Sequence, residues 1–223
     1  KLRKLNELRR KCPHMTASAM SALLQQVDAE GVPELHGRKH VGEASEVELA
    51  QHDAYGPLIE PLSCISKDGG QREISIVNVP TFLQALYGQT GAWSDLVKIT
   101  CANHGNKLSL IMYYDEIVPG DPLGYANKRK FWVCYISFKE FGPRMLANEA
   151  VWLPILTLRT AISKDFSAGI SQVCKHLLLN TFSSSRVDVR LAGLLLKGDD
   201  GQTMIMFIDV RLLVQDGAAH KLV

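Results

Sequence analysis

Short apolar segments separated by turn residues make up the first half of the chain. Apolar residues recur at helical spacing over residues 17–30, where a helix is expected. Two strand-like segments, 57–66 and 71–79, flank Lys67-Asp68-Gly69-Gly70 and predict a β-hairpin. The pattern also favours short helices over residues 43–56, over 82–89 behind the capping residue Asn78, and over 90–104.

The second half of the chain has longer and more regular segments. Residues 107–114 and 130–138 are rich in β-branched and aromatic side chains and predict two strands, which we expect to pair because they are neighbours in sequence. Residues 147–163 and 168–182 have the spacing of helices. The remaining apolar segments predict a hairpin with strands over 187–197 and 202–215. In its second strand, side chains alternate between two faces, and the even-numbered residues 204–214 are expected to share one of them. Both faces are largely apolar, which favours a central position in the sheet.

These elements predict an α/β fold with a mixed sheet flanked by helices. Residues 31–43 contain three glycines and one proline, which is typical of a linker. We therefore expect a basic helical N-terminal arm at 1–43 and a mixed α/β domain at 44–223. The chain has no initial Met and stops directly after a strand-like segment, so we interpret it as a piece of a longer protein.

Composition narrows the class of protein further. With 46% hydrophobic and 22% charged residues, the chain is typical of a globular protein. Its five scattered cysteines include no Cys-x-x-Cys pair, which argues against a disulfide framework and a zinc ribbon and favours a reducing, intracellular compartment. No apolar segment approaches the roughly 20 residues that span a bilayer, so we expect no membrane partner.

Positive charge is concentrated at the start of the chain. The formal net charge is +2, yet residues 1–11 carry six basic groups against the single acid Glu7. Such an arm suits nucleic acid or an acidic partner. The spacing of Leu2, Leu5 and Leu8 equally fits a solvated amphipathic helix, and the sequence leaves both readings open.

Two of the predicted strands are followed at once by an acidic residue. Asp115 follows residues 107–114, and Asp216 follows residues 202–215. If these strands lie side by side with aligned ends, the carboxylates converge and repel one another unless a cation joins them. Paired Mg²⁺ ions held in this way activate water and stabilise the leaving oxygen in phosphodiester cleavage. Aspartate after a strand is equally a turn residue that accepts from the next backbone amides.

The residues around Asp115 extend this hypothesis. Glu116 is expected on the opposite face of the strand, where it either supports the metal ligands or meets solvent. Lys128, Arg129 and Lys130 either contact phosphates near Asp115 or form the polar start of the next strand. Farther along, we interpret Asp209 and Arg211 as a structural pair, with Arg190 as a further candidate partner.

The segment YYDEIVPGDPLG, followed by NKRKFWVCYISF, resembles a signature of uncharacterised proteins encoded by multicopy mobile elements. That signature reads Tyr-x-Asp-acid, then Asn or Asp before Pro-Leu-Gly, then a basic residue and an aromatic strand. Asp115, Glu116, residues 121–124 and Lys130 match it, with Asp121 where Asn is more usual. Asp216, in LLVQDGAAHK, matches a later strand that ends on Asp. The resemblance covers residues 53–223.

Those mobile elements in turn resemble DDE-type transposases, whose catalytic domain has the ribonuclease H fold. The resemblance implies that Asp115 and Asp216 are catalytic ligands of Mg²⁺ or Mn²⁺, that Glu116 supports them, and that Lys128, Arg129 and Lys130 bind DNA, with a nuclear location. It also implies a third acid beyond Val223, so the sheet is expected to be incomplete at its C-terminus and this chain inactive by itself. The alternative is a non-enzymatic interaction module derived from such an element.

Overall fold

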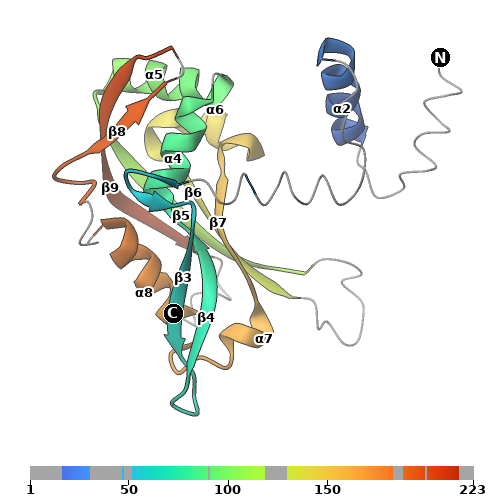
Figure 1. Cartoon of the computed structure of the whole chain (residues 1–223), viewed down its shortest axis with the longest axis vertical. Coiled ribbons are helices and arrows are strands. Elements are labelled where there is room, and N and C mark those ends of the chain that lie inside the picture. Colours follow the sequence, from blue (N-terminus) through green and yellow to red (C-terminus); the bar gives the residue numbers. More distant parts are fainter. Residues whose placement is uncertain are drawn as a thin grey trace, which may run out of the picture. The chain divides into compact units, whose positions relative to one another are not determined.

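The computed structural model describes residues 17–30, 47, 52–89, 91–118, 130–182, 188–198 and 200–215. The chain divides into two compact units, residues 1–48 and 49–223. The first contains helix α2 (Ala17–Glu30), as the sequence predicts (Figure 1). Of the described side chains of α2, only Met20 is buried. The basic arm, the linker and the expected boundary at residues 43 and 44 lie outside the described residues.

The second unit is built on a mixed sheet of five strands in the order β7-β6-β5-β9-β8. All neighbouring strands in it are antiparallel except β5 and β9, which are parallel. The expected α/β class and mixed sheet are therefore confirmed. The strands are β5 (Lys107–Ile117), β6 (Phe131–Phe138), β7 (Leu153–Arg159), β8 (Leu194–Lys197) and β9 (Thr203–Gln215).

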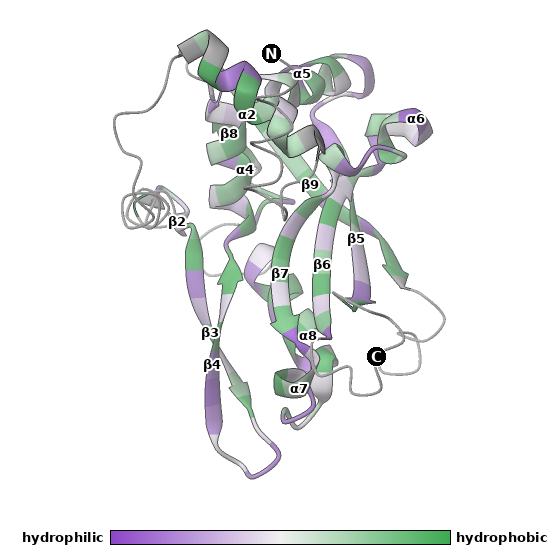
Figure 2. Ribbon diagram, turned by 90° about the vertical axis from the view of Figure 1, so that its right-hand side faces the viewer, coloured by the Kyte–Doolittle hydropathy of each residue, from purple (hydrophilic) through white to green (hydrophobic). Residues whose placement is uncertain are grey.

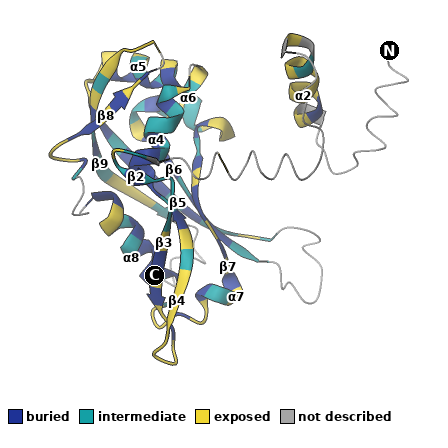
Figure 3. Ribbon diagram, viewed as in Figure 1, coloured by how far each residue is buried: buried dark blue, intermediate teal, exposed yellow. Residues whose placement is uncertain are grey.

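Two hairpins precede the sheet. The predicted hairpin forms from β3 (Ile59–Ile65) and β4 (Gln71–Val77), and β4 is exposed over much of its length (Figure 3). The predicted helix over 43–56 is wrong at its described end, because β1 (His52–Asp53) pairs with β2 (Gly56–Pro57). There the Asp53 carboxylate accepts from the backbone N–H of Tyr55 at 2.7 Å, a local bond that competes with a helix.

Three of the helices predicted for the second unit are present. The side chain of Asn78 caps the first of them by accepting from the Thr81 N–H at 3.3 Å, as expected from the sequence. The last of them packs against the sheet, because Cys174 in it adjoins Tyr114 of β5. These helices are α4 (Val79–Gly88), α5 (Ala92–His104) and α8 (Gly169–Phe182). A 3₁₀ turn, η1 (Lys139–Phe141), and the short helix α6 (Gly142–Leu146) follow β6.

The helix predicted over 147–163 is wrong. This segment forms a 3₁₀ turn, η2 (Glu149–Val151), then strand β7 and the short helix α7 (Thr160–Ser163). Pairing with β6 shifts register between Pro154 and Leu156, so that Ile155 is an extra residue, and Ile155 and Leu156 are both buried. Two consecutive buried residues break the strict alternation of a strand, which made the apolar spacing look helical. Pro154 is tolerated because β7 is an edge strand.

The C-terminal hairpin is present, but its first strand is shorter than predicted. β8 begins at Leu194 instead of residue 187, because residues 189–192 form a turn. The Asp188 carboxylate accepts from the backbone N–H of Arg190 and pairs with its guanidinium at 2.8 Å, while the charge of Asp209 acts on Arg190 more weakly and raises its pKa slightly further. β9 lies between β5 and β8 in the strand order, but β8 pairs with residues 203–206 and β5 with residues 207–215, so each part of β9 is paired on one side only.

Candidate functional site

Asp115 lies within a strand and not at its end. β5 runs on to Ile117, with Asp115 opposite Val133 and Glu116 opposite Trp132 in the β6 ladder. The prediction that the strand stops at residue 114 is therefore wrong. The reason is that pairing with the aromatic start of β6 holds the two acids in extended conformation. The reading of Asp115 as a turn residue is excluded by the same pairing.

The two acids point to opposite faces of the sheet, as strand geometry requires. On one face, which we call the closed face, Leu108, Leu110, Met112 and Tyr114 are all buried. Glu116 continues this row. Asp115 belongs to the other face, where its half-buried carboxylate accepts from the Tyr113 hydroxyl at 3.1 Å. Among the described residues, this is the only hydrogen bond of the Asp115 side chain, so its oxygens retain capacity for a cation.

Glu116 is engaged in holding the fold together. Its carboxylate accepts from the Thr160 hydroxyl at 2.7 Å and from the Lys130 ammonium at 3.0 Å. Burial raises the pKa of this carboxyl, but the hydrogen bonds from Thr160 and Lys130 and the charges of Lys130 and Lys164 outweigh it, and the pKa is lowered. Glu116 thus ties the end of β5 to α7 and to the start of β6.

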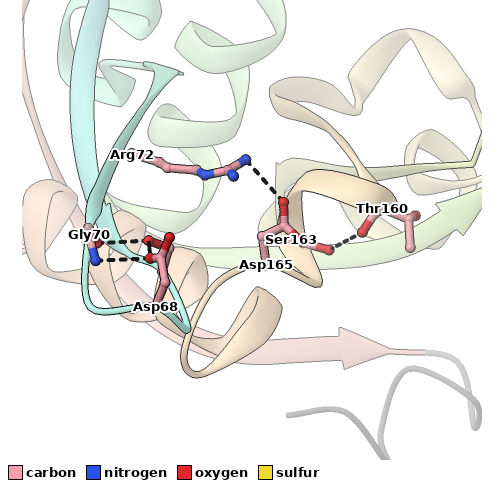
Figure 4. Close-up of polar contacts among 7 residues, drawn as sticks. Asp68, Gly70, Arg72, Thr160, Ser163 and Asp165 are labelled. Atoms are coloured by element: carbon pink, nitrogen blue, oxygen red, sulfur yellow. Dashed lines mark hydrogen bonds and ion pairs between the residues drawn. The ribbon is translucent and has the colours of Figure 1, made fainter.

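The contacts of Thr160 continue into the β3–β4 hairpin (Figure 4). The Ser163 hydroxyl donates to the Thr160 carbonyl at 3.0 Å, within α7. Just after α7, Asp165 pairs with Arg72 of β4 at 3.0 Å, and its carbonyl accepts from the Lys67 N–H at 2.8 Å. Glu116 therefore stands at one end of a polar chain that fastens the hairpin to the sheet.

β9 lies beside β5 and parallel to it, as the metal hypothesis requires. Leu110 is opposite Val210, but Ile111 is opposite Leu212, so Arg211 is an extra residue in a β-bulge. Beyond the bulge, Leu212 and Val214 share the face of Ile111 and Tyr113, which corrects the expectation that even-numbered residues of this strand all share one face. The ladder then reaches Tyr114 opposite Gln215.

Of the remaining predicted site residues, some are described by the structure and others are not. Asp216, Lys128 and Arg129 lie outside the described residues. Lys130 is described, and its ammonium is paired with Glu116 while its side chain remains 40% exposed. The predicted pair of Asp209 and Arg211 is confirmed at 3.5 Å. Within the described ranges, no group of three His, Cys, Asp or Glu side chains is placed to hold a metal ion.

The face that carries Asp115, which we call the open face, holds three rows of side chains, all partly or fully exposed except the buried Val133 in the middle row. Figure 2 shows the strands β7, β6 and β5 that carry them side by side. Across β5, β6 and β7 the rows are Ile117–Phe131–Arg159, Asp115–Val133–Thr157 and Tyr113–Tyr135–Pro154. Sequence reasoning missed this surface, although Phe131 and Tyr135 are separated by an even number of positions and therefore lie on one strand face.

The aromatic rings on this face form a packed group. Tyr113 stacks on Tyr135 with ring centroids 6.2 Å apart, and Trp152 meets Tyr113 edge-on at 6.0 Å. The Trp152 indole N–H donates to the Leu146 carbonyl at 2.9 Å, which fixes the ring. At the end of the face, the Arg159 guanidinium lies 5.9 Å from the centroid of the Phe131 ring.

A comparison of the chain with protein-family models, curated proteins and solved structures finds no match. In the part of the chain that the structure describes, no helix has the length and apolar character to cross a membrane.

Proposed function

We propose that residues 49–223 belong to a nucleic-acid-processing domain of the transposase type, with a ribonuclease H-like sheet. It would cleave or join phosphodiester bonds with Mg²⁺ or Mn²⁺. The observation that carries this proposal is the parallel pairing of β5 and β9, with Tyr114 opposite Gln215. Each of these residues directly precedes one of the two acids, Asp115 and Asp216.

The bulge at Arg211 determines whether continued pairing would bring Asp216 opposite Asp115 or opposite Glu116. If the pairing continues by one residue, Asp216 is opposite Asp115 on the open face. Without the bulge, the register at Leu110 and Val210 would bring Asp216 opposite Glu116, whose carboxylate is already engaged by Thr160 and Lys130. β-Bulges are common beside active sites because they re-aim side chains in this way.

The order of elements supports the proposal as well. The resemblance to DDE-type transposases implies a first acid on the first strand of the sheet and a second at the end of the strand that follows the first helices. Here β5 is the first strand of the five-stranded sheet, and β9 follows α7 and α8. This agreement in order supports a ribonuclease H-like sheet.

In this proposal, Asp115 and Asp216 hold the metal, and Tyr113 orients the Asp115 carboxylate through its hydroxyl. When bound, Mg²⁺ or Mn²⁺ polarises the phosphate and activates the attacking water. With a third acid expected only beyond Val223, two carboxylates leave the ion mostly hydrated and weakly bound. This chain alone should therefore bind metal weakly and cut no DNA.

A second candidate is an interaction module without catalysis. It is favoured by the absence of a three-ligand cluster among the described residues and by the structural use of Glu116. In this reading Asp115 is a polar residue of a binding face, and no metal is required.

Titration with Mn²⁺, followed by the electron paramagnetic resonance signal of the free ion, separates these candidates. We expect weak binding that falls at least about tenfold in Asp115→Asn and in Asp216→Asn, since each removes a ligand. The matched control is Asp209→Asn, an acid on β9 that pairs with Arg211 and should not affect binding. Equal Mn²⁺ affinity in all three variants and the wild type would overturn the metal site. DNA cleavage by the protein extended past Val223 in its gene, and its loss in both variants, tests the catalytic role.

A further inference from the structure

The open face next to Asp115 offers rigid, partly exposed rings. Tyr113 and Tyr135 are both half-buried, and their stacked rings are inclined by 22°. Trp152 supports this pair from the side, and its own indole N–H is anchored to a backbone carbonyl. Rings held in this way lose little conformational entropy on binding, and they suit planar, apolar groups that stack.

A positive charge lies at the end of this face. The Arg159 side chain is exposed, and among the described residues it forms no ion pair; its guanidinium rests over Phe131. Arg159 and Phe131 are opposite each other, one row beyond Asp115. Rings beside an unpaired arginine are the combination that binds unpaired nucleic acid, with bases on the rings and phosphates near the cation.

The polar residues of the face argue against an apolar protein partner. Asp115 and Thr157 occupy the middle row, between the aromatic row and Arg159. A second copy of the chain, or an apolar helix, laid across this surface would bury the Asp115 carboxylate against rings without a counter-charge, which is costly. A nucleic-acid strand leaves the carboxylate hydrated or joined to a metal.

We propose that the open face binds an unpaired nucleic-acid strand, with a base stacked on the Tyr113–Tyr135 pair and phosphate next to Arg159. Side chains on one strand face repeat about every 7 Å, so the phosphate of the nucleotide stacked on Tyr113 reaches the Asp115 row, and the phosphate of the next nucleotide reaches Arg159. The inference rests on the proposed function in that this strand would be the substrate of the Asp115 site. It names unpaired strands, and not intact duplex, as the preferred form.

The test is fluorescence anisotropy with a labelled oligothymidine of about 12 nucleotides, in low salt and with EDTA present. Tyr135→Leu keeps apolar volume but cannot stack, and it should weaken binding at least about fivefold. Tyr135→Phe keeps the ring and should bind like the wild type, which separates stacking from a merely structural role. Arg159→Ala should weaken binding and flatten its salt dependence. Its charge-matched control is Lys175→Ala, an exposed cation on α8, which should have no effect.

The outcomes distinguish this inference from the proposed function. If the oligonucleotide binds as described but Mn²⁺ binding ignores Asp115, the stacking face stands and the catalytic proposal fails. If Mn²⁺ binding needs Asp115 but Tyr135→Leu binds the oligonucleotide as well as the wild type does, the stacking face is wrong and the metal site stands. A preference for the matching duplex over the single strand also overturns the inference.

Discussion

The sequence Tyr113-Tyr114-Asp115-Glu116 places one tyrosine and one acid on each face of the same strand. On the closed face, Tyr114 is 1% exposed and Glu116 is bound by Thr160 and Lys130. On the open face, Tyr113 is half-buried, and Asp115 accepts from Tyr113 itself. The same two kinds of side chain therefore stabilise the fold on the closed face and remain partly exposed on the open face.

This contrast shows that the partners of a polar residue, more than its type, indicate its role. Glu116 is tied to a residue 44 positions away in sequence, so its charge is part of the tertiary structure. Asp115 interacts with its neighbour two residues away, and this local bond leaves most of its capacity unused. Of two adjacent acids, the one that has no distant partner among the described residues is the better candidate for a ligand site.

The most direct test of the difference between the two faces is to truncate each tyrosine to alanine. Tyr114→Ala should lower the free energy of unfolding by about 3–5 kcal/mol, because it leaves a cavity in the core. Tyr113→Ala should lower it by only about 1 kcal/mol, since that ring is partly solvated. Urea unfolding followed by circular dichroism measures both. Similar costs for the two variants would show that the open face is as much a part of the core as the closed face.

Much of the fold could be predicted from local sequence. The strands predicted over 107–114 and 130–138 form, although the first runs on to Ile117, and Asn78 begins a helix as its capping chemistry requires. The parallel, side-by-side placement of β5 and β9 meets the condition that the metal hypothesis sets. Each of these features depends on residues close in sequence or on a simple rule for neighbouring strands.

Local hydrogen bonds of Asp53 and Asp188 account for the errors at residues 52–57 and 187–193, and the other errors arose where a distant strand sets the conformation. The bulges at Ile155 and Arg211 are fixed by register against β6 and β5, and a single sequence does not display register. The extension of β5 through Asp115 depends on pairing with β6. The role of Glu116 could not be predicted for a related reason. Its partner Thr160 belonged to the helix predicted over 147–163, and this segment instead forms β7 and the short helix α7.

Exchanging each acid for its amide tests the same difference between the faces, with smaller expected changes in stability. Glu116→Gln should destabilise by about 1 kcal/mol, a modest value because Glu116 and Lys130 are partly exposed. Asp115→Asn should change stability by less than about 0.5 kcal/mol, or raise it if Asp216 repels Asp115. A loss in Asp115→Asn as large as that in Glu116→Gln would contradict the assignment of roles.

The destabilisation caused by Glu116→Gln should also depend on pH, in a direction set by the lowered pKa of Glu116. The pKa of Glu116 is lowered in the folded chain, so its charge stabilises the fold above the ordinary carboxyl pKa. That contribution is lost as the pH falls through the lowered pKa. The difference in unfolding free energy between the wild type and Glu116→Gln should therefore shrink from about pH 6 to about pH 3. A difference that stays constant over this range would exclude the charge of Glu116 as its cause.

The smallest expected effect concerns the hydroxyl of Tyr114. Burial raises the pKa of this phenol, with the Cys134 and Cys174 thiols beside it adding to the shift, so the hydroxyl stays protonated. Among the described residues it has no well-formed hydrogen-bond partner. Removing an unpaired buried polar group relieves a desolvation penalty, so Tyr114→Phe should be neutral or stabilise by up to about 1 kcal/mol. Tyr113→Phe, by contrast, deletes the donor to Asp115 and should lower Mn²⁺ affinity without changing stability by more than about 0.5 kcal/mol. If Tyr114→Phe destabilises clearly, the thiols accept a real hydrogen bond, and the closed face leaves no polar group unsatisfied at this position.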